Sequence, residues 1–346
     1  AYLMVGGAVG CAKFFAPFAL FILGLCSWFC FRQLKFAPAA CLLGGLAAML
    51  NSGVFSTACW GVAGQCITFG MSYLALGFLA DEASPRRWLK VVLAGMAVGM
   101  GLMEGADIGA IFSLYVAAFV MFQALTAGGA PGLRILKGVF RTVVVAVFAA
   151  LIAAQFIGVM ISTQIKGVAG SQQDTQTKEQ RWDWATQWSL PKAETLSFAV
   201  PGLFGYRMDT PEGGQYWGII GRFPGWQREF GLNGARYTGG GVYSGILVLL
   251  IAAWAVTQAF RKQGSVFSDR DRKWIWFWSG AAVISLLLAW GKYAPFYRLL
   301  YALPYFSNIR NPAKFTHCFN WAIVVLFAYG AHGLIKAYVG ESLVRA

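Results

Sequence analysis

Long apolar blocks separated by short polar connections make up most of the chain. Many of the blocks are about as long as the 17–25 residues that a helix needs to cross roughly 30 Å of hydrocarbon. The second block is short and contains Gly44 and Gly45, so we expect it to be tilted or only partly inserted. The pattern predicts nine spanning helices, at about residues 14–31, 37–51, 65–80, 88–103, 108–126, 139–163, 242–260, 274–291 and 318–338.

The composition places much of the exterior of this protein in lipid. Of the 346 residues, 58% are hydrophobic and only 12% are charged, and the mean hydropathy is +0.58. A soluble domain carries roughly 25% charged residues, because its surface has to be solvated. The 42 glycines suit close contact between helices in lipid. We therefore expect an all-α polytopic membrane protein, with about nine transmembrane helices and one large outward-facing loop domain.

The basic residues orient this set of helices, because short cytoplasmic loops of membrane proteins are enriched in Lys and Arg. They gather in alternate connections, whereas the connections at 51–64 and 104–107 hold none. The C-terminus is therefore predicted to be cytoplasmic. The basic residues of these connections are Arg32, Lys35, Arg86, Arg87, Lys90, Arg134, Lys137, Arg141, Arg261, Lys262, Arg270, Arg272, Lys273, Lys336 and Arg345.

Residues 164–241 differ in composition from the rest of the chain. A polar run is followed by a region rich in Trp, Pro and Gly, and its many aromatic residues argue against disorder. We expect an extracytoplasmic cap at 164–241, with membrane helices before it at 1–163 (about six spans) and after it at 242–346 (about three). Because apolar sequence starts at Ala1 without a Met, we also expect the chain to be part of a longer protein.

Two carboxylates stand between the fourth and fifth predicted spans. Glu104 and Asp107 are three residues apart, which places them on one face if the turn is helical. Paired carboxylates can act as acid and base or bind a divalent cation such as Mg or Mn. The alternative is that they cap the two helices, with Asp107 capping the fifth.

Four cations on the outer side depart from the orientation rule. Lys292, Arg298, Arg310 and Lys314 precede the last span, on the face that should be poor in positive charge. Such an excess suggests that they meet anions, for example a phosphorylated substrate. The alternative is anchoring to lipid head groups.

Several functions are disfavoured by the sequence. The net charge of +14 lies in short clusters between apolar blocks, which argues against a nucleic-acid partner. No P-loop, nucleophile elbow, zinc-protease or haem-binding pattern is present in the sequence. Cys59 and Cys66 flank a predicted outer connection, where a disulfide is an alternative to two free thiols.

Three segments resemble the bacterial YfhO-type multi-spanning membrane proteins, which are related to the GT-C class of glycosyltransferases. These segments are LAAMLNSGVFSTACWG at 46–61, MEGADIGAIFSLY at 103–115 and LPYFSNIRNPAKF at 303–315. The resemblance implies transfer of a sugar from a polyprenyl-phosphate donor to an acceptor at the outer face of the bacterial cytoplasmic membrane. GT-C enzymes usually carry the catalytic acid in the first outer loop, before the region that this chain covers.

The site that we expect therefore combines this resemblance with physical reasoning. Glu104 and Asp107 are the catalytic candidates, and Arg298, Arg310 and Lys314 are expected to bind the phosphate of the lipid carrier. Asn51, Trp60 and Trp217 are expected to line the acceptor groove, because aromatic faces suit sugar rings. Two other readings remain open: a structural subunit of a membrane complex, with protein partners that the sequence does not name, and a lipid or solute transporter.

Overall fold

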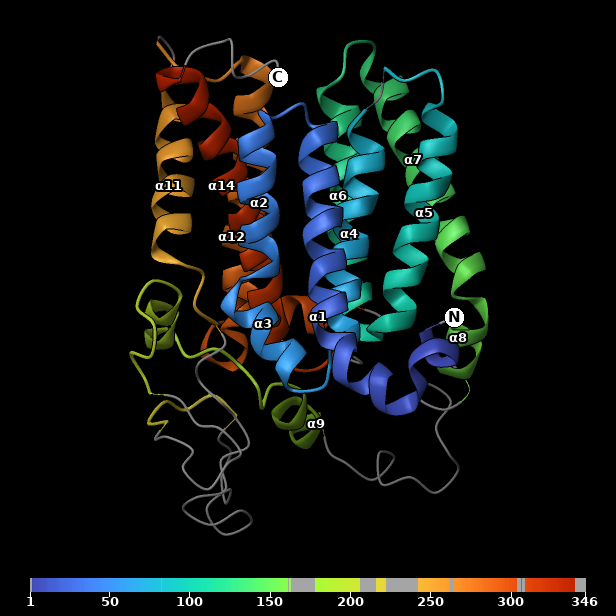
Figure 1. Cartoon of the computed structure of the whole chain (residues 1–346), viewed down its shortest axis with the longest axis vertical. Helices are drawn as coiled ribbons and strands as arrows, with labels where there is room; N and C mark the ends of the chain where they lie inside the picture. The colour runs from blue at the N-terminus through green and yellow to red at the C-terminus, as the bar shows by residue number, and fades with distance from the viewer. Residues whose placement is uncertain are drawn as a thin grey trace.

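Figure 1 shows the fold as a computed structural model. The residues that the structure describes are 2–81, 83–160, 162, 178–205, 216–221, 242–261, 264–303, 306 and 309–339. Throughout these residues the regular structure is helical, which confirms the all-α prediction for this part of the chain.

Each of the nine predicted blocks overlaps a helix of the described chain, although the sixth, at 139–163, runs past the end of its helix at Ile152. These helices are α1 (Tyr2–Gln33), α2 (Pro38–Met49), α4 (Gly64–Ala80), α5 (Arg87–Glu104), α6 (Ala106–Thr126), α7 (Pro131–Ile152), α11 (Ile246–Phe260), α12 (Asp269–Ala289) and α14 (Phe315–Tyr338). The shorter elements are α3 (Ser52–Cys59), α8 (Ala154–Met160), α9 (Lys178–Ala185), η3 (Ala193–Phe198), η5 (Gly291–Tyr293), α13 (Phe296–Tyr301) and η7 (Pro312–Lys314).

Fewer than nine of these helices qualify as membrane spans by length and composition. Within the described residues, four are long and apolar enough: Lys13–Gln33, Ala106–Thr126, Pro131–Ile152 and Pro312–Tyr338. A fifth arises if α2 and α3, which meet at a bend of 46°, form one broken span. Helices α4 and α11 are apolar but shorter, and α5 and α12 begin with charged residues. The structure therefore has four or five candidate spans.

The long helices run side by side along the vertical direction of Figure 1. Helix α14, the last described helix, ends at the upper end of the bundle in that view. The lower end carries α3 and α9. The short connections that contain the clustered basic residues lie at the upper end.

Helix α14 forms the centre of one half of the bundle. It packs against α2, α11 and α12, and its side chains are mostly buried from Phe315 to Gly333. The Trp321 ring lies among the rings of Tyr73, Phe112 and Trp278, with centroid distances of 5.6, 5.0 and 5.0 Å. Such edge-to-face packing of aromatic rings adds to the stability of the core.

Helices α5 and α7 approach each other through two glycines. A Cβ atom added to Gly95 would lie 2.7 Å from the carbonyl oxygen of Val145, and one added to Gly99 would lie 2.7 Å from that of Ala149. Small residues four positions apart let two backbones come this close, which is a common way of packing helices in lipid. Gly95 and Gly99 thus serve the close contact between helices that the many glycines of the sequence suggested.

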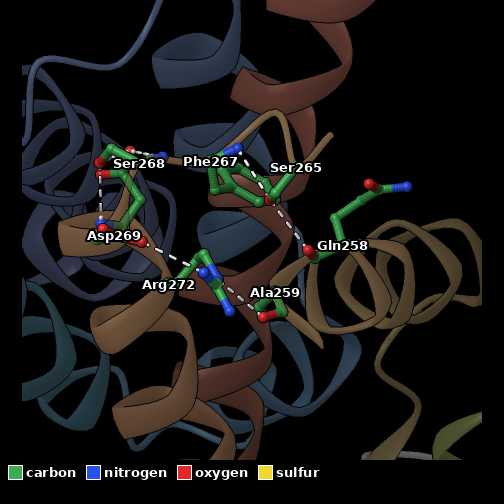
Figure 2. Close-up of polar contacts among 8 residues, drawn as sticks. Gln258, Ala259, Ser265, Phe267, Ser268, Asp269 and Arg272 are labelled. Atoms are coloured by element: carbon green, nitrogen blue, oxygen red, sulfur yellow. Dashed lines mark hydrogen bonds and ion pairs between the residues drawn. The ribbon is translucent and has the colours of Figure 1, made fainter. Parts of the chain in front are cut away.

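The connection between α11 and α12 at the upper end is held by its own polar groups, as Figure 2 shows. Ser268 accepts a hydrogen bond from the backbone N–H of Asp271 and donates to the Asp271 carboxylate, which also accepts from the Ser268 N–H. This capping box satisfies orphan donors at the start of α12. Arg272 ties the two helices together by donating from Nε to the carbonyl of Ala259, at 3.0 Å.

The described part of 164–241 lies against the lower ends of α12 and α14. The Leu190 N–H donates to the Ala289 carbonyl at 2.8 Å, and the Ala313 N–H donates to the Trp188 carbonyl at 2.8 Å. The buried Glu194 carboxylate accepts from the backbone N–H of Ile219 at 2.7 Å. Residues 164–177, 206–215 and 222–241, which complete the predicted cap, lie outside the described residues.

Candidate functional site

A cavity of about 290 Å³ lies at the lower end, where α3, the start of α14 and the described part of 164–241 meet. Its walls combine aromatic rings with hydroxyl, amide and imidazole groups. The lining residues are Gly53, Ser56, Thr57, Trp60, Val62, Gln65, Ile108, Trp188, Leu190, Ile220, Val242, Asn311, Ala313, Lys314, Thr316 and His317. We refer to it as the lower cavity.

Helix α3 forms one wall because the chain turns at Asn51. The Asn51 side chain accepts a hydrogen bond from the Gly53 N–H at 3.0 Å and so caps the helix. The resulting bend of 46° from α2 sends α3 across the lower end, where Trp60 follows it. The polar connection at 51–60 is thus a short helix whose residues, including Trp60, line the cavity.

The lower cavity has a charged pair at its edge. Lys314 lines the cavity and forms an ion pair with Asp107, although the two residues are 207 positions apart. Asp107 lies in the first turn of α6, where a carboxylate is favoured by the helix dipole; it is not the N-cap residue. The side chain of Lys314 is 17% exposed and that of Asp107 is 43% exposed, so the pair lies at the boundary with solvent.

Glu104 is not part of this pair. It is exposed at the end of α5, and among the described residues no hydrogen bond or ion pair connects it to Asp107. In the described chain there is also no group of three or more His, Cys, Asp and Glu side chains that could hold a metal ion. Because Asp107 already faces the ammonium of Lys314, these residues do not fit a divalent cation site.

The other predicted phosphate ligands lie on indole rings. The Arg310 guanidinium is 3.8 Å from the ring centre of Trp184, and that of Arg298 is 5.2 Å from the ring centre of Trp182. Both distances are typical of cation–π contacts. Neither arginine lines the lower cavity, so only Lys314 of the three predicted phosphate ligands does.

Trp217 lies apart from the lower cavity as well. Its indole is exposed and packs on Phe204 at a centroid distance of 4.6 Å. The nearby Ile220 does line the cavity, so the segment at 216–221 contributes to it through an aliphatic side chain.

A second, much smaller cavity of about 20 Å³ adjoins the lower cavity, since His317 lines both. Asn51 and Trp321 are buried in its wall, and neither Asn51 Nδ2 nor Trp321 Nε1 has a hydrogen-bond partner among the described residues. The Asn51 amide orientation follows from its oxygen accepting the Gly53 N–H, which leaves the nitrogen as the unpaired end. The small cavity therefore has two free N–H donors in its wall.

Tyr297 fixes the segment that carries Arg310 and Lys314. Its hydroxyl donates to the Ile309 carbonyl at 2.6 Å, and burial raises the pKa of this hydroxyl, so it stays protonated. Burial also lowers the pKa of Lys292, and the carboxylate of Asp183 opposes that shift. The Asn311 N–H donates to the Ala185 carbonyl at 2.8 Å and joins the same segment to α9.

Sequence reasoning missed His317, Asn320 and Trp188 as site residues. A signal for the first two was present, since Lys314, His317 and Asn320 are spaced by three residues and share one helical face. Trp188 carries no comparable signal, because its place at the cavity depends on contacts between distant segments.

The helical bundle with several long apolar helices is that of a multi-pass membrane protein. Comparison with family models, with curated proteins and with solved structures gives no match to this chain. The resemblance to YfhO-type proteins and to glycosyltransferases therefore stays a prediction from three sequence segments.

Proposed function

We propose that this protein transfers a sugar from a polyprenyl-phosphate donor to an acceptor hydroxyl at the outer face of a bacterial cytoplasmic membrane. The observation that carries the proposal is the Asp107–Lys314 pair at the edge of the lower cavity. It brings together a base and a phosphate-binding cation that the sequence separates by 207 positions. A carboxylate that accepts a proton and a cation that stabilises a departing phosphate are groups that such a transfer can use.

The proposal includes the membrane orientation and all nine spans. The lower end is then the outer face, because the short connections at the upper end hold the clustered basic residues. In that orientation the lower cavity opens where the phosphate of a lipid-linked sugar lies. Its volume of about 290 Å³ is at the small end of the range for ligand pockets.

The ion pair suggests how binding and chemistry are coupled. The donor phosphate displaces the carboxylate from Lys314, which frees Asp107 to act as a base. The acceptor oxygen then attacks the anomeric carbon of the sugar and its proton passes to Asp107. The bond from that carbon to the phosphate oxygen breaks, and Lys314 stabilises the negative charge on the departing lipid phosphate.

The remaining walls suit the sugar and the acceptor. The indoles of Trp60 and Trp188 offer flat apolar faces, and Ser56, Thr57 and Gln65 offer hydrogen-bonding groups beside them. The unpaired donors Asn51 Nδ2 and Trp321 Nε1 suit an oxygen atom of a bound ligand that reaches past His317.

The test is a transfer assay with the full-length protein in membrane vesicles. A panel of radiolabelled polyprenyl-phosphate sugars is supplied, and movement of the label to lipid, glycan or protein is measured. Asp107→Asn and Lys314→Met should each lower transfer by about 100-fold or more, as expected when a charge-stabilising group is lost. Arg310→Ala should have a smaller effect, because Arg310 lies on Trp184 and outside the cavity.

Lys137→Met is the matched control, since Lys137 is exposed on α7 and does not line the lower cavity. It should leave transfer unchanged. Transfer that persists in both Asp107→Asn and Lys314→Met would remove these residues from the mechanism. Absence of transfer from every donor would reject the glycosyltransferase function.

One observation favours a second candidate, a lipid transporter. A further cavity of about 600 Å³, which we refer to as the upper cavity, lies at the upper end, so cavities occur at both ends of α14. A series of ring contacts runs from Trp321 at the small cavity through the buried Trp278 and Phe119 to Trp274 in the wall of the upper cavity. These packed rings argue against a continuous path in this conformation. Movement of labelled lipid across vesicles without sugar transfer would select the transporter.

A further inference from the structure

We propose that the upper cavity is a second binding site, for the head group of an anionic glycerophospholipid that also carries a hydroxyl group. This cavity has a volume of about 600 Å³ and lies at the end of the bundle opposite the lower cavity. The inference does not depend on the proposed sugar transfer. The residues that line the cavity are Gln33, Leu34, Lys35, Ala80, Asp81, Ala83, Gln123, Thr126, Ala127, Arg270, Asp271, Lys273, Trp274 and Tyr329.

The charges around the upper cavity favour an anion. Lys35, Arg270 and Lys273 line it, and none of them has an ion-pair partner among the described residues. Two carboxylates also line it, but both are engaged in other contacts. Asp81 accepts from Lys90 Nζ at 2.7 Å, and Asp271 belongs to the capping box of α12. Lys35 also interacts electrostatically with Asp81, so the observation that favours a phosphate group is the excess of three cations over two carboxylates in the wall.

The backbone at Lys35 supports a role for its side chain. Lys35 has a φ of 63°, in the left-handed region that favours glycine. The Phe36 N–H donates to the Phe31 carbonyl and the Lys35 N–H to the Arg32 carbonyl, the two bonds of a Schellman motif, whose left-handed position is usually glycine. A lysine there costs backbone strain. Because strained positions cluster at functional sites, the strain supports a binding role for the ammonium group.

Gln123 adds a requirement for a hydrogen-bond donor on the ligand. Its side chain is 4% exposed, and its Nε2 donates to the Leu79 carbonyl at 3.0 Å. The oxygen Oε1 is therefore the free end, and it has no partner among the described residues. The hydroxyl of Thr126 already donates to the carbonyl of Phe122 at 2.8 Å. A ligand that satisfies Gln123 must bring its own donor.

The position of the cavity selects a lipid as the source of this phosphate. The cavity is built from the ends of α1, α4 and α6, and the long apolar surfaces of these helices stop at its level. A phosphodiester with a free hydroxyl, as in phosphatidylglycerol, matches the three cations and the Gln123 oxygen together. A soluble phosphate ester offers the same chemistry without the lipid tails.

The test measures lipid binding to the delipidated full-length protein in detergent, by native mass spectrometry. Phosphatidylglycerol is compared with phosphatidylmethanol, which has the same charge but no hydroxyl, and with glycerol 3-phosphate as the soluble form. Phosphatidylglycerol should bind about tenfold more tightly than phosphatidylmethanol, the factor that one good hydrogen bond gives. Equal binding of these two lipids would contradict the role of Gln123, and binding of glycerol 3-phosphate as tight as that of phosphatidylglycerol would contradict the lipid source.

Two variants separate binding from folding. Lys35→Gly relieves the left-handed backbone, so its unfolding temperature should stay equal or rise while binding of phosphatidylglycerol falls about tenfold. Gln123→Met removes the acceptor and should make phosphatidylglycerol and phosphatidylmethanol bind alike. Lys137→Gln, an exposed lysine that does not line the cavity, is the control and should bind as the unchanged protein does. Wild-type binding by Lys35→Gly would overturn the proposal.

Discussion

Helices α7 and α14 are both long and apolar, yet they occupy opposite environments. Only 17% of the apolar window of α7 is buried inside the protein, whereas 83% of that in Pro312–Tyr338 is buried. Helix α7 packs against α5 and α6 on one side and exposes large side chains such as Leu136, Val147 and Leu151 on the other. Hydropathy therefore identifies both helices without telling which one faces lipid.

The difference is visible in the polar residues that each helix buries. Helix α14 contains buried Thr316, Asn320 and His332, and His332 Nδ1 accepts the N–H of Ala37 at 3.0 Å just before α2. The segment from 312 to 338 contributes to all three cavities, for example through His317 below and Tyr329 above. A buried apolar helix with polar residues along its length is thus where sites form in this bundle.

The largest difference between the two helices is expected when one leucine on each is replaced by alanine. Leu326 of α14 is 2% exposed, and Leu326→Ala should lower the free energy of unfolding by about 2–5 kcal/mol through lost packing and a residual cavity. Leu136 of α7 is 64% exposed, and Leu136→Ala should change it by less than about 0.5 kcal/mol. Unfolding in detergent provides the measurement. Equal losses would mean that α7 is covered by a partner.

The second prediction concerns a place where α7 is tightly packed against α5. Gly99→Ala forces a Cβ against the carbonyl of Ala149 and should cost about 1–3 kcal/mol in unfolding free energy. Gly132→Ala, in the first turn of α7 with nothing within 4 Å, should leave the protein equally or slightly more stable. If both variants behaved alike in thermal unfolding, the close approach of α5 and α7 would be disproved.

A smaller effect is expected where the cavities along α14 meet α3. Asn51→Ser keeps a good N-cap for α3 but removes the free amide donor, so sugar transfer should fall by up to about tenfold with little loss of stability. Asn51→Ala loses the cap as well and should cost about 1 kcal/mol more in unfolding free energy. Unchanged transfer by Asn51→Ser would show that the small cavity takes no part in ligand binding.

The smallest effect lies outside both helices, at Asp81. The hydrogen bond from Lys90 lowers the pKa of Asp81 below its usual value of 3.8. The resulting stabilisation is present above pH 3.8 and is lost as the pH falls through the lower pKa of the folded state. Asp81→Asn should thus cost a few tenths of a kcal/mol near neutral pH, typical of a surface pair. The difference from the unchanged protein should vanish in unfolding measurements at strongly acidic pH.

The helices could be predicted from the sequence because the pattern of apolar blocks is local. Each of the nine predicted blocks overlaps a helix, but α2 bends into α3 and α5 begins with charged residues, so fewer of these helices qualify as membrane spans than the blocks predict. Nine spans and the cytoplasmic C-terminus stay predictions.

The site was harder to predict, because it depends on contacts between distant segments. Asp107 and Lys314 were each found by their unexpected charge, and the structure joins them in one ion pair. Arg310 drew the same interpretation from its charge, but it lies on the ring of Trp184, a contact that no spacing reveals. Charge at a boundary can be read from a sequence, whereas its partner across the bundle cannot.

The end of α3 offers a practical route to the topology of this protein. Cys59 is exposed and free, next to Trp60 at the lower cavity, whereas Cys26, Cys30, Cys41, Cys66 and Cys318 are buried. The side chain of Cys11 lies outside the described residues, so Cys11 is first replaced by serine. In that variant, a membrane-impermeant maleimide should label intact cells at Cys59. A fluorophore attached there would report both the side of the membrane on which the cavity opens and the arrival of a ligand beside Trp60.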